Sequence, residues 1–406
     1  MELKKWKQFC LCSMGGSFPA DAEPADALFS PLVFLVNRDP LRSRGWFAVS
    51  SVEELSEPED CSVLLPPRPC EAPKELQAFV REHGATVLNT AFANAFPFLA
   101  SSKKQAGLRV TLVGLGDVGG TLLTALKLLG RELAEIRIFD PNEAQCRRYE
   151  AELNQVLSLD DTSLPRVMLC PQEALFDCDL FLFTASRGVP AVGAEVKDVR
   201  MAQFERNRDM LSAYAKAARD AGFRGLFCQI SDPVDQLARV VFLQSNRDEA
   251  GRFDAKGLLP EQVQGFGLGV MAARAEYYAA QMGIAFSQGR VFGPHGNDLI
   301  VANHPTEYDQ TLSEALTKAT VTANLRVREL GFKPYIAPAL SSAAVSILRL
   351  VRGQTHYGAV PMGGAYFGCR SRMTAQGLSV LREPLHPALY ARVQAVQHSL
   401  EDFCYD

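Results

Sequence analysis

The sequence lacks the features that mark membrane-spanning, nucleic-acid-binding and metal-binding proteins. No stretch of about 18 residues is both uncharged and apolar, so no transmembrane helix is expected. The net charge of −4 offers no basic field to nucleic acid or to an anionic membrane surface. The ten cysteines never form Cys-x-x-Cys and the histidines show no ligand-like spacing, so we expect reduced thiols and no bound metal.

The chain also lacks internal repeats and long low-complexity segments. Near the amino terminus, the apolar run Phe9–Met14 is too short for the core of a secretory signal peptide, so we expect a cytoplasmic protein. The composition is that of a globular chain, with 47% hydrophobic and 22% charged residues. A length of 406 residues is sufficient for two or three domains.

Residues 1–103 are expected to form a small α/β domain, and the polar stretch Ser101–Gln105 is typical of a linker. A helix is expected over Pro73–His83, among several short strands. No motif in this region indicates a chemical role, and its purpose stays open. The predicted strands are Leu32–Val36, Phe47–Val49, Ser62–Leu65 and Thr86–Leu88.

Between residues 104 and 258, short apolar strands alternate with helices. The strand Arg109–Val113, the helix Gly119–Leu129 and the strand Glu135–Phe139 begin this pattern. Because strands covered by helices on both faces are apolar throughout, the alternation predicts a Rossmann-type, doubly wound parallel sheet. Its further elements are the strands Arg166–Leu169, Asp179–Thr184 and Gly225–Ile230 and the helix Met201–Ala221.

After Pro260 the pattern changes, and residues 259–406 are predicted to form an α+β substrate domain. The fold class is therefore α/β: a Rossmann-type sheet followed by an α+β domain, with a small α/β domain in front. The elements expected in the last domain are the strands Arg290–Phe292 and Leu299–Ala302 and the helices Thr311–Leu330 and Ser341–Val351.

A glycine-rich turn joins the first strand of the parallel sheet to its helix. Gly114, Gly116 and Gly119 form G-x-G-x-x-G, with Asp117 and Val118 between the last two. The first glycine permits a tight turn, the second lets backbone amides approach a pyrophosphate, and the third allows close packing of helix and strand. The amino terminus of the helix then attracts phosphate, so the turn predicts a dinucleotide site.

Asp140 ends the second strand, where a carboxylate can accept hydrogen bonds from ribose hydroxyls and repel a 2′-phosphate. We therefore expect NAD rather than NADP as cofactor. The alternative is that the glycines are ordinary turn residues and that Asp140 only caps a strand.

Further segments stand downstream in a fixed order. They are Thr184-Ala-Ser-Arg-Gly-Val-Pro190 with Arg200-Met-Ala-Gln-Phe-Glu-Arg-Asn207, Ile230-Ser-Asp232-Pro-Val-Asp235, Gly265-Phe-Gly-Leu-Gly-Val-Met271-Ala-Ala-Arg274 and Gly293-Pro-His295-Gly-Asn-Asp298. Behind the dinucleotide motif, this order and spacing resemble the lactate/malate dehydrogenase family. The resemblance covers residues 107–374, about two-thirds of the chain.

This resemblance implies a role for each segment. Thr184 and Ala185 would lie beside the cofactor. Arg200, at the end of a loop about five residues longer than usual, would polarise the substrate carbonyl, because a guanidinium stabilises the developing charge. Arg274 would clamp the substrate carboxylate with its planar fork. His295 would exchange the proton.

Two positions depart from the family pattern. Met271 stands where the family has an Asp that orients the histidine, and Asp232 stands where it has an Asn that contacts substrate and nicotinamide. Either Asp232 compensates by orienting or charge-stabilising His295, or the reaction is lost, because an unpaired imidazolium is costlier to form. Taken singly, Arg200 could be a solvated surface residue and Arg274 a packing residue.

Our leading interpretation is an NAD-dependent oxidoreductase that moves a hydride between nicotinamide and a 2-hydroxy or 2-oxo acid. The catalytic residues would be His295, Arg200 and Asp232, with Arg274 and Arg200 binding the substrate. The resemblance further implies a homo-oligomer, a dimer or a tetramer. The alternatives are a catalytically weak NAD-binding sensor or partner-binding protein, and an enzyme for a bulkier acid that uses the longer loop.

Overall fold

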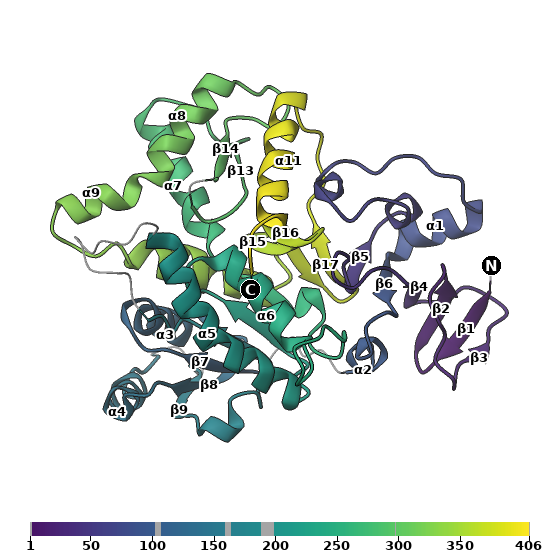
Figure 1. Cartoon of the computed structure of the whole chain (residues 1–406), viewed down its shortest axis with the longest axis horizontal. Coiled ribbons are helices and arrows are strands. Elements are labelled where there is room, and N and C mark those ends of the chain that lie inside the picture. The colour runs from purple at the N-terminus through teal and green to yellow at the C-terminus, as the bar shows by residue number, and fades with distance from the viewer. Residues whose placement is uncertain (1, 102–106, 159–163, 188–198, 297, 406) are drawn as a thin grey trace.

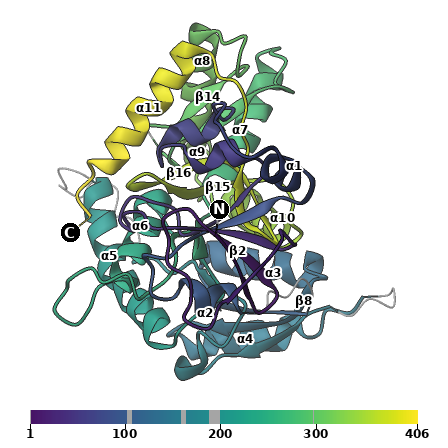
Figure 2. The same ribbon diagram turned by 90° about the vertical axis from the view of Figure 1, so that its right-hand side faces the viewer.

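The structure is a computed structural model that describes residues 2–101, 107–158, 164–187, 199–296 and 298–405, with the side chains of residues 199–203 outside the description. Figure 1 shows three regions: the parallel sheet with α3 and α4, a lobe with α7, α8 and α9 above it, and the amino-terminal unit to one side. Figure 2, turned to face that unit, shows α8 and α11 at one end and α3, α4 and β8 at the other.

The amino-terminal unit has a sheet of order β3-β1-β2-β4-β6-β5. The apolar run near the start of the chain is a buried strand of this sheet. The predicted helix is confirmed as α1, but the predicted strand Ser62–Leu65 is wrong. Those residues lie in a 3-10 helix, Cys61–Leu64, because the Asp60 side chain accepts the Ser62 N–H and starts a tight turn. The elements are β1 (Leu3–Trp6), β2 (Phe9–Ser13), β3 (Glu23–Pro24), β4 (Leu32–Val36), β5 (Trp46–Val49), β6 (Ala85–Asn89), α1 (Lys74–His83), α2 (Ala95–Leu99) and a 3-10 helix Val52–Leu55.

The middle of the chain forms a doubly wound parallel sheet, as predicted. Its strand order is β9-β8-β7-β10-β11-β12, which is the 3-2-1-4-5-6 order of the Rossmann fold. The elements are β7 (Leu108–Val113), α3 (Asp117–Leu129), β8 (Leu133–Phe139), α4 (Glu143–Leu153), β9 (Arg166–Leu169), β10 (Leu180–Phe183), α5 (Val199–Asp220), β11 (Leu226–Gln229), α6 (Val234–Ser245) and β12 (Val263–Gly265), with a 3-10 helix Gln172–Ala174.

The last region mixes helices with antiparallel strands. The predicted helix Thr311–Leu330 is two helices, and the one predicted at Ser341–Val351 begins earlier as a π-helical segment, Pro338–Val345. The elements are a 3-10 helix Pro260–Gln262, α7 (Leu268–Gln281), β13 (Arg290–Phe292), β14 (Ile300–Ala302), α8 (Gln310–Val321), α9 (Ala323–Glu329), α10 (Ser346–Val351), β15 (His356–Met362), β16 (Ala365–Thr374), β17 (Gly377–Val380) and α11 (Pro387–Glu401).

The regions share one sheet of fifteen strands. Strand β12 pairs with β15, and β17 pairs with β5 at the edge of the amino-terminal unit. The buried Glu261 carboxylate reinforces this junction, since it accepts the backbone N–H groups of Gly45 and Trp46. The sixth parallel strand lies just beyond the expected boundary at residue 258, and the division at 103 and 258 stays a prediction.

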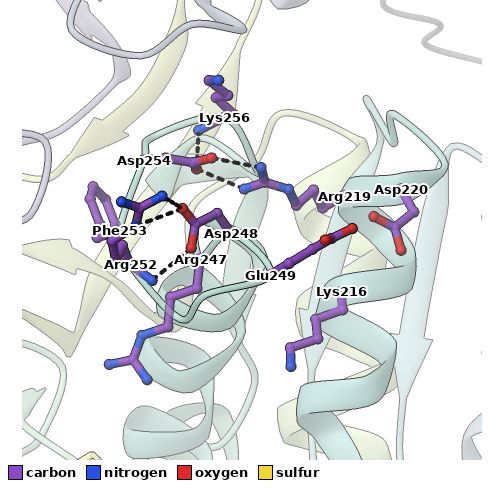
Figure 3. A pocket seen from close by; sticks show the side chains of 10 residues that line it. All are labelled: Lys216, Arg219, Asp220, Arg247, Asp248, Glu249, Arg252, Phe253, Asp254 and Lys256. Carbon is purple, nitrogen blue, oxygen red and sulfur yellow. Dashed lines mark hydrogen bonds and ion pairs between the residues drawn. The ribbon is translucent and has the colours of Figure 1, made fainter.

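The amino and carboxyl ends of the parallel strands carry different kinds of residues. A hollow at the amino ends of the strands is lined by charged residues of α5 and of the loop after α6 (Figure 3). Two ion pairs lie within it, Arg219–Asp254 and Arg252–Asp248. Several of the predicted site residues follow the carboxyl ends of the strands, on the opposite side of the sheet from this hollow. Ligands of open α/β sheets bind at the carboxyl ends.

Candidate active site

The glycine-rich turn after β7 is a close contact between backbone segments. Gly114 has φ +94°, and a Cβ added to it would lie 2.6 Å from the Ala185 backbone nitrogen. A Cβ added to Gly119 would lie 1.9 Å from the Gly114 carbonyl oxygen and 2.7 Å from Thr184 Oγ1. Both positions therefore require glycine, which confirms the expected packing of helix against strand.

The first turn of α3 is left open to a ligand. Gly116 precedes the helix and contributes no capping side chain to the amides of its first turn. A Cβ added to Gly116 would meet no atom of the described residues within 4 Å, so the structure leaves room beside this glycine. Uncapped amides beside this room fit a pyrophosphate, because the helix amino terminus carries partial positive charge.

Asp140 follows the end of β8 and lies against the same turn. One carboxylate oxygen accepts the Leu115 N–H at 2.8 Å and the other accepts the Asn142 N–H at 2.9 Å. The carboxylate is thereby fixed beside the glycine-rich turn, and each oxygen keeps a lone pair for a ribose hydroxyl.

The other residues expected to contact the cofactor shape this turn. The Thr184 hydroxyl donates to the Gly114 carbonyl at 2.7 Å, and the Ala185 carbonyl accepts from the Ser231 hydroxyl at 2.7 Å. Val118 packs against the buried core beneath the helix. Asp117 faces solvent at the start of α3 and makes an ion pair that is described below.

His295 lies two residues beyond a tight turn at Gly293, which follows β13. Its imidazole Nδ1 is 2.8 Å from Oδ1 of Asp232, which lies three residues after the end of β11. The imidazole is 15% exposed and the Asp232 side chain 50%. The structure therefore brings His295 and Asp232, both singled out from the sequence, into direct contact.

A second carboxyl group, that of Asp235, accepts a hydrogen bond from the backbone of His295. The backbone N–H of His295 donates to Asp235 Oδ2 at 2.9 Å, and Asp235 is buried in the first turn of α6. Burial raises the pKa of Asp235 to about 7. For His295, burial lowers the pKa, but attraction to Asp232 and Asp235 outweighs it and the pKa is raised overall. The charged imidazolium is therefore favoured.

Helix α7 carries both Met271 and Arg274. Gly267 directly precedes its first residue, and a Cβ added there would lie 2.7 Å from the His295 Cβ, so the start of the helix and His295 are in close contact. Met271 lies one turn further on and is buried. Its sulfur accepts a weak hydrogen bond from Arg274 Nη1 at 3.7 Å. Burial lowers the pKa of the Arg274 guanidinium, which Asp232 and Tyr278 partly offset.

Arg200 lies in the first turn of α5, and its side chain falls outside the described part of the structure. The longer loop before it, residues 188–198, falls outside as well. Further along α5, the buried Asn207 donates to the Asp232 backbone carbonyl at 2.8 Å and accepts the Arg187 N–H at 3.0 Å. This amide ties α5 to the segment that presents Asp232.

Some site residues had no role in the sequence interpretation. Asn207 and Asp235 stood within the quoted segments, but nothing else in the sequence marked them as site residues. Gly267 was visible only as part of a glycine-rich run. Lys333, the partner of Asp117, had no sequence signal, because it lies 216 residues away along the chain.

The chain is similar in sequence to known lactate dehydrogenases. It is 29% identical over 197 residues to L-lactate dehydrogenase 2 of Staphylococcus aureus, an alignment that covers 48% of this chain and 56% of that protein. The chain thus spans about half the length of the curated relatives it matches. In sequence, the chain is thus similar to L-lactate dehydrogenases. No model of a known protein family matches it.

Solved structures show the same fold. A minor L-lactate dehydrogenase from Enterococcus mundtii superposes with a TM-score of 0.60 at 16% identity, covering 73% of this chain and 97% of that one. A malate dehydrogenase from Archaeoglobus fulgidus, solved in complex with NADH, gives 0.60 at 16% identity over 73% and 98%. A lactate dehydrogenase from a deep-sea metagenome gives 0.59 at 17% identity, covering 73% and 97%.

Two kinds of feature are absent from the described residues. No helix within them has the length and apolar character needed to cross a membrane. No group of three or more His, Cys, Asp or Glu side chains among them could hold a metal ion.

Proposed function

We propose that this protein is an NAD-dependent oxidoreductase of a 2-hydroxy or 2-oxo acid, related to the lactate and malate dehydrogenases. The observation that carries the proposal is the His295–Asp232 contact of 2.8 Å. This pair is close enough to Arg274 for the two to influence each other electrostatically, and Asp232, like the glycine-rich turn, follows the carboxyl end of a parallel strand. A histidine paired with a carboxylate can hold and release a proton near neutral pH. A half-buried arginine can bind a carboxylate through two hydrogen bonds.

The roles follow from these positions. Arg274 binds the substrate carboxylate and sets the substrate against His295. Because Nδ1 is held by Asp232, Nε2 is the nitrogen that gives its proton to the substrate carbonyl oxygen during reduction and takes it back during oxidation. The nicotinamide, when bound, supplies or accepts the hydride. Arg200 polarises the carbonyl from the start of α5.

Asp232 takes over the electrostatic work that Met271 cannot do. A thioether has no charge to stabilise an imidazolium, whereas the Asp232 carboxylate contacts the ring directly and raises the pKa of His295 against the effect of burial. The charge needed by the histidine is therefore supplied from the end of β11 instead of from α7.

NAD is the expected cofactor because Asp140 holds a negative charge at the end of β8, next to the turn that would bind the pyrophosphate. The fit rests on the glycine contacts, the uncapped first turn of α3 and the room beside Gly116. A 2′-phosphate would be repelled by the Asp140 carboxylate.

We also propose that the protein is a homo-oligomer. Several large apolar side chains along α9 and the segment after it are exposed, and exposed apolar surface is typical of an interaction site. They are Leu325, Leu330, Phe332, Ile336, Leu340 and Val345, with exposures of 36% to 74%. The mass measured by sedimentation should exceed that of one chain, and Leu330→Glu should reduce it.

The test of the function is a screen of 2-oxo acids with NADH, following loss of the reduced-nicotinamide absorbance. At least one acid should be reduced, and Arg274→Lys should raise its KM sharply, because Lys keeps the charge but loses the fork. The matched control is Arg326→Lys on the exposed face of α9, which should leave the KM unchanged.

Met271 favours a second candidate, a protein that binds NAD without turnover. The screen separates the two. Binding of NADH without reduction of any acid would support the non-enzyme, and an Arg274→Lys variant with an unchanged KM would remove the assignment of the substrate carboxylate.

A further inference from the structure

An ion pair joins the carboxyl-terminal half of the chain to the glycine-rich turn. The Lys333 ammonium lies 2.9 Å from Asp117 Oδ2. Asp117 is the first residue of α3 and stands inside the dinucleotide motif, whereas Lys333 belongs to the connection between α9 and the π-helical segment. The pair therefore lies where a pyrophosphate would approach the helix.

The position of Lys333 is fixed by packing. The segment Pro338–Val345 packs along α3, and its residues Ala343 and Ala344 share a buried core with Leu122 and Leu126 of that helix. Lys333 precedes this segment by five residues. The docking of this segment therefore brings the Lys333 ammonium to the first turn of α3.

Asp117 needs such a partner if the turn binds a dinucleotide. A carboxylate in the first turn of a helix is favourable in the free protein, because it complements the helix dipole. Next to a pyrophosphate, the same carboxylate is a like charge and opposes binding. A cation on Asp117 removes that repulsion while leaving the backbone amides of Gly116 and Val118 to the phosphates.

We propose that Lys333 is a positioning residue of the dinucleotide turn: it holds and neutralises Asp117, so that the amino terminus of α3 keeps its affinity for a pyrophosphate. The inference rests on the proposed binding of NAD and adds a determinant from the distant half of the chain. Lys333 and Asp117 are 80% and 47% exposed, so their pair contributes little to the stability of the fold. Its effect belongs to ligand binding.

The test is calorimetric titration of the full chain with NADH and with ADP-ribose, which retains the pyrophosphate but lacks nicotinamide. Lys333→Met keeps most of the side chain and removes the charge, and it should weaken both ligands about tenfold. Lys333→Arg should restore the affinity. The control, Lys318→Met on the exposed face of α8, should bind like the parent, and all variants should melt at the parent's temperature.

A double mutant identifies the route of the effect. In the Asp117→Asn background no carboxylate remains to be neutralised, so Lys333→Met should no longer weaken NADH or ADP-ribose. The weakening in the parent background should also shrink at high salt. Equal affinity of the parent and Lys333→Met overturns the inference alone. An equally large loss in the Asp117→Asn background overturns it too, because Lys333 would then act on the phosphates directly. A parent that binds neither ligand overturns both the inference and the proposed function.

Discussion

The two halves of the candidate site are built in different ways. The dinucleotide half is formed mainly by the backbone. It consists of glycines packed too closely against neighbouring backbone to carry a Cβ, a helix terminus without a side-chain cap, and a carboxylate that accepts a main-chain N–H. The other half is side chains brought together from β11, α7 and the turn after β13. At Gly114 and Gly119 this backbone site accepts only glycine, because an added Cβ would collide with neighbouring backbone. A side-chain site needs a charge at a point in space, and that charge can come from another strand.

Met271 and Asp232 illustrate this freedom. Met271 lies one helical turn beyond Gly267, which contacts His295, so position 271 faces the neighbourhood of the imidazole from α7. The carboxylate instead comes from Asp232 at the end of β11. The segment Asp232–Asp235 supplies both acids, one for the ring and one for the backbone N–H of His295.

The largest expected effect is in the backbone half. Gly119→Ala would place a Cβ 1.9 Å from the Gly114 carbonyl oxygen, so the turn must open and NADH binding should fall by more than about 100-fold. The melting temperature should fall as well. Titration and thermal melting measure both. Gly364→Ala, where a Cβ makes only ordinary contacts, is the control for a glycine outside the site.

Gly116→Ala tests NADH binding separately from stability. The added Cβ meets no atom of the described residues within 4 Å, so the melting temperature should stay near that of the parent while NADH binding weakens. If Gly116→Ala binds NADH as well as the parent does, the room beside this glycine is not the pyrophosphate site.

The next effect is in the side-chain half. Asp232→Asn restores the family's residue but removes the anion from the His295 ring, so turnover should fall about 100-fold. Because Asp232 raises the pKa of His295, the variant should protonate its histidine only at lower pH. The pH above which 2-oxo acid reduction declines should therefore shift downward, which a pH–rate profile measures.

Met271→Asp provides the rescue. In the Asp232→Asn background it should restore turnover, because a carboxylate returns to the vicinity of His295 from α7. In the parent it should do little or reduce activity through repulsion between two carboxylates. Parent-like activity of Asp232→Asn would show that the relocated charge is not needed.

A smaller effect is expected at Asp140. Asp140→Ala removes the charge that repels a 2′-phosphate and the acceptor of the Leu115 N–H. Binding of NAD should weaken about tenfold while the preference over NADP is relaxed. Titration of parent and variant with both cofactors decides this, and equal affinities of the parent for NAD and NADP would contradict it.

The same contrast explains what the sequence could predict. Gly114, Gly119 and Asp140 lie close together in a local strand–turn–helix unit, where the motif itself specifies the geometry. The pairing of Asp232 with His295 could be raised only as one alternative, because 63 residues separate them. Strands β15, β16 and β17 were not expected, since their burial depends on the amino-terminal unit that continues their sheet.

The smallest effect on the site is expected from a change at Glu261, which joins the parallel sheet to the amino-terminal unit. Burial raises the pKa of Glu261 to about 8, whereas an unfolded chain releases this proton near the ordinary value of 4.5. The folded protein therefore loses stability as the pH rises from about 4.5 to about 8, on the order of a few kcal/mol. Glu261→Gln keeps an acceptor for the Gly45 and Trp46 N–H groups but cannot ionise, so its stability relative to the parent should increase across this window.

Denaturant unfolding at several pH values measures the Glu261→Gln difference, with the exposed Glu314→Gln on α8 as the control that should show no such trend. NADH affinity and turnover should equal those of the parent, because Glu261 contacts neither half of the site. A stability difference that does not depend on pH would mean that Glu261 stays ionised when buried. A loss of NADH affinity would mean that the amino-terminal unit supports the dinucleotide half, and the site could no longer be treated as two separate halves.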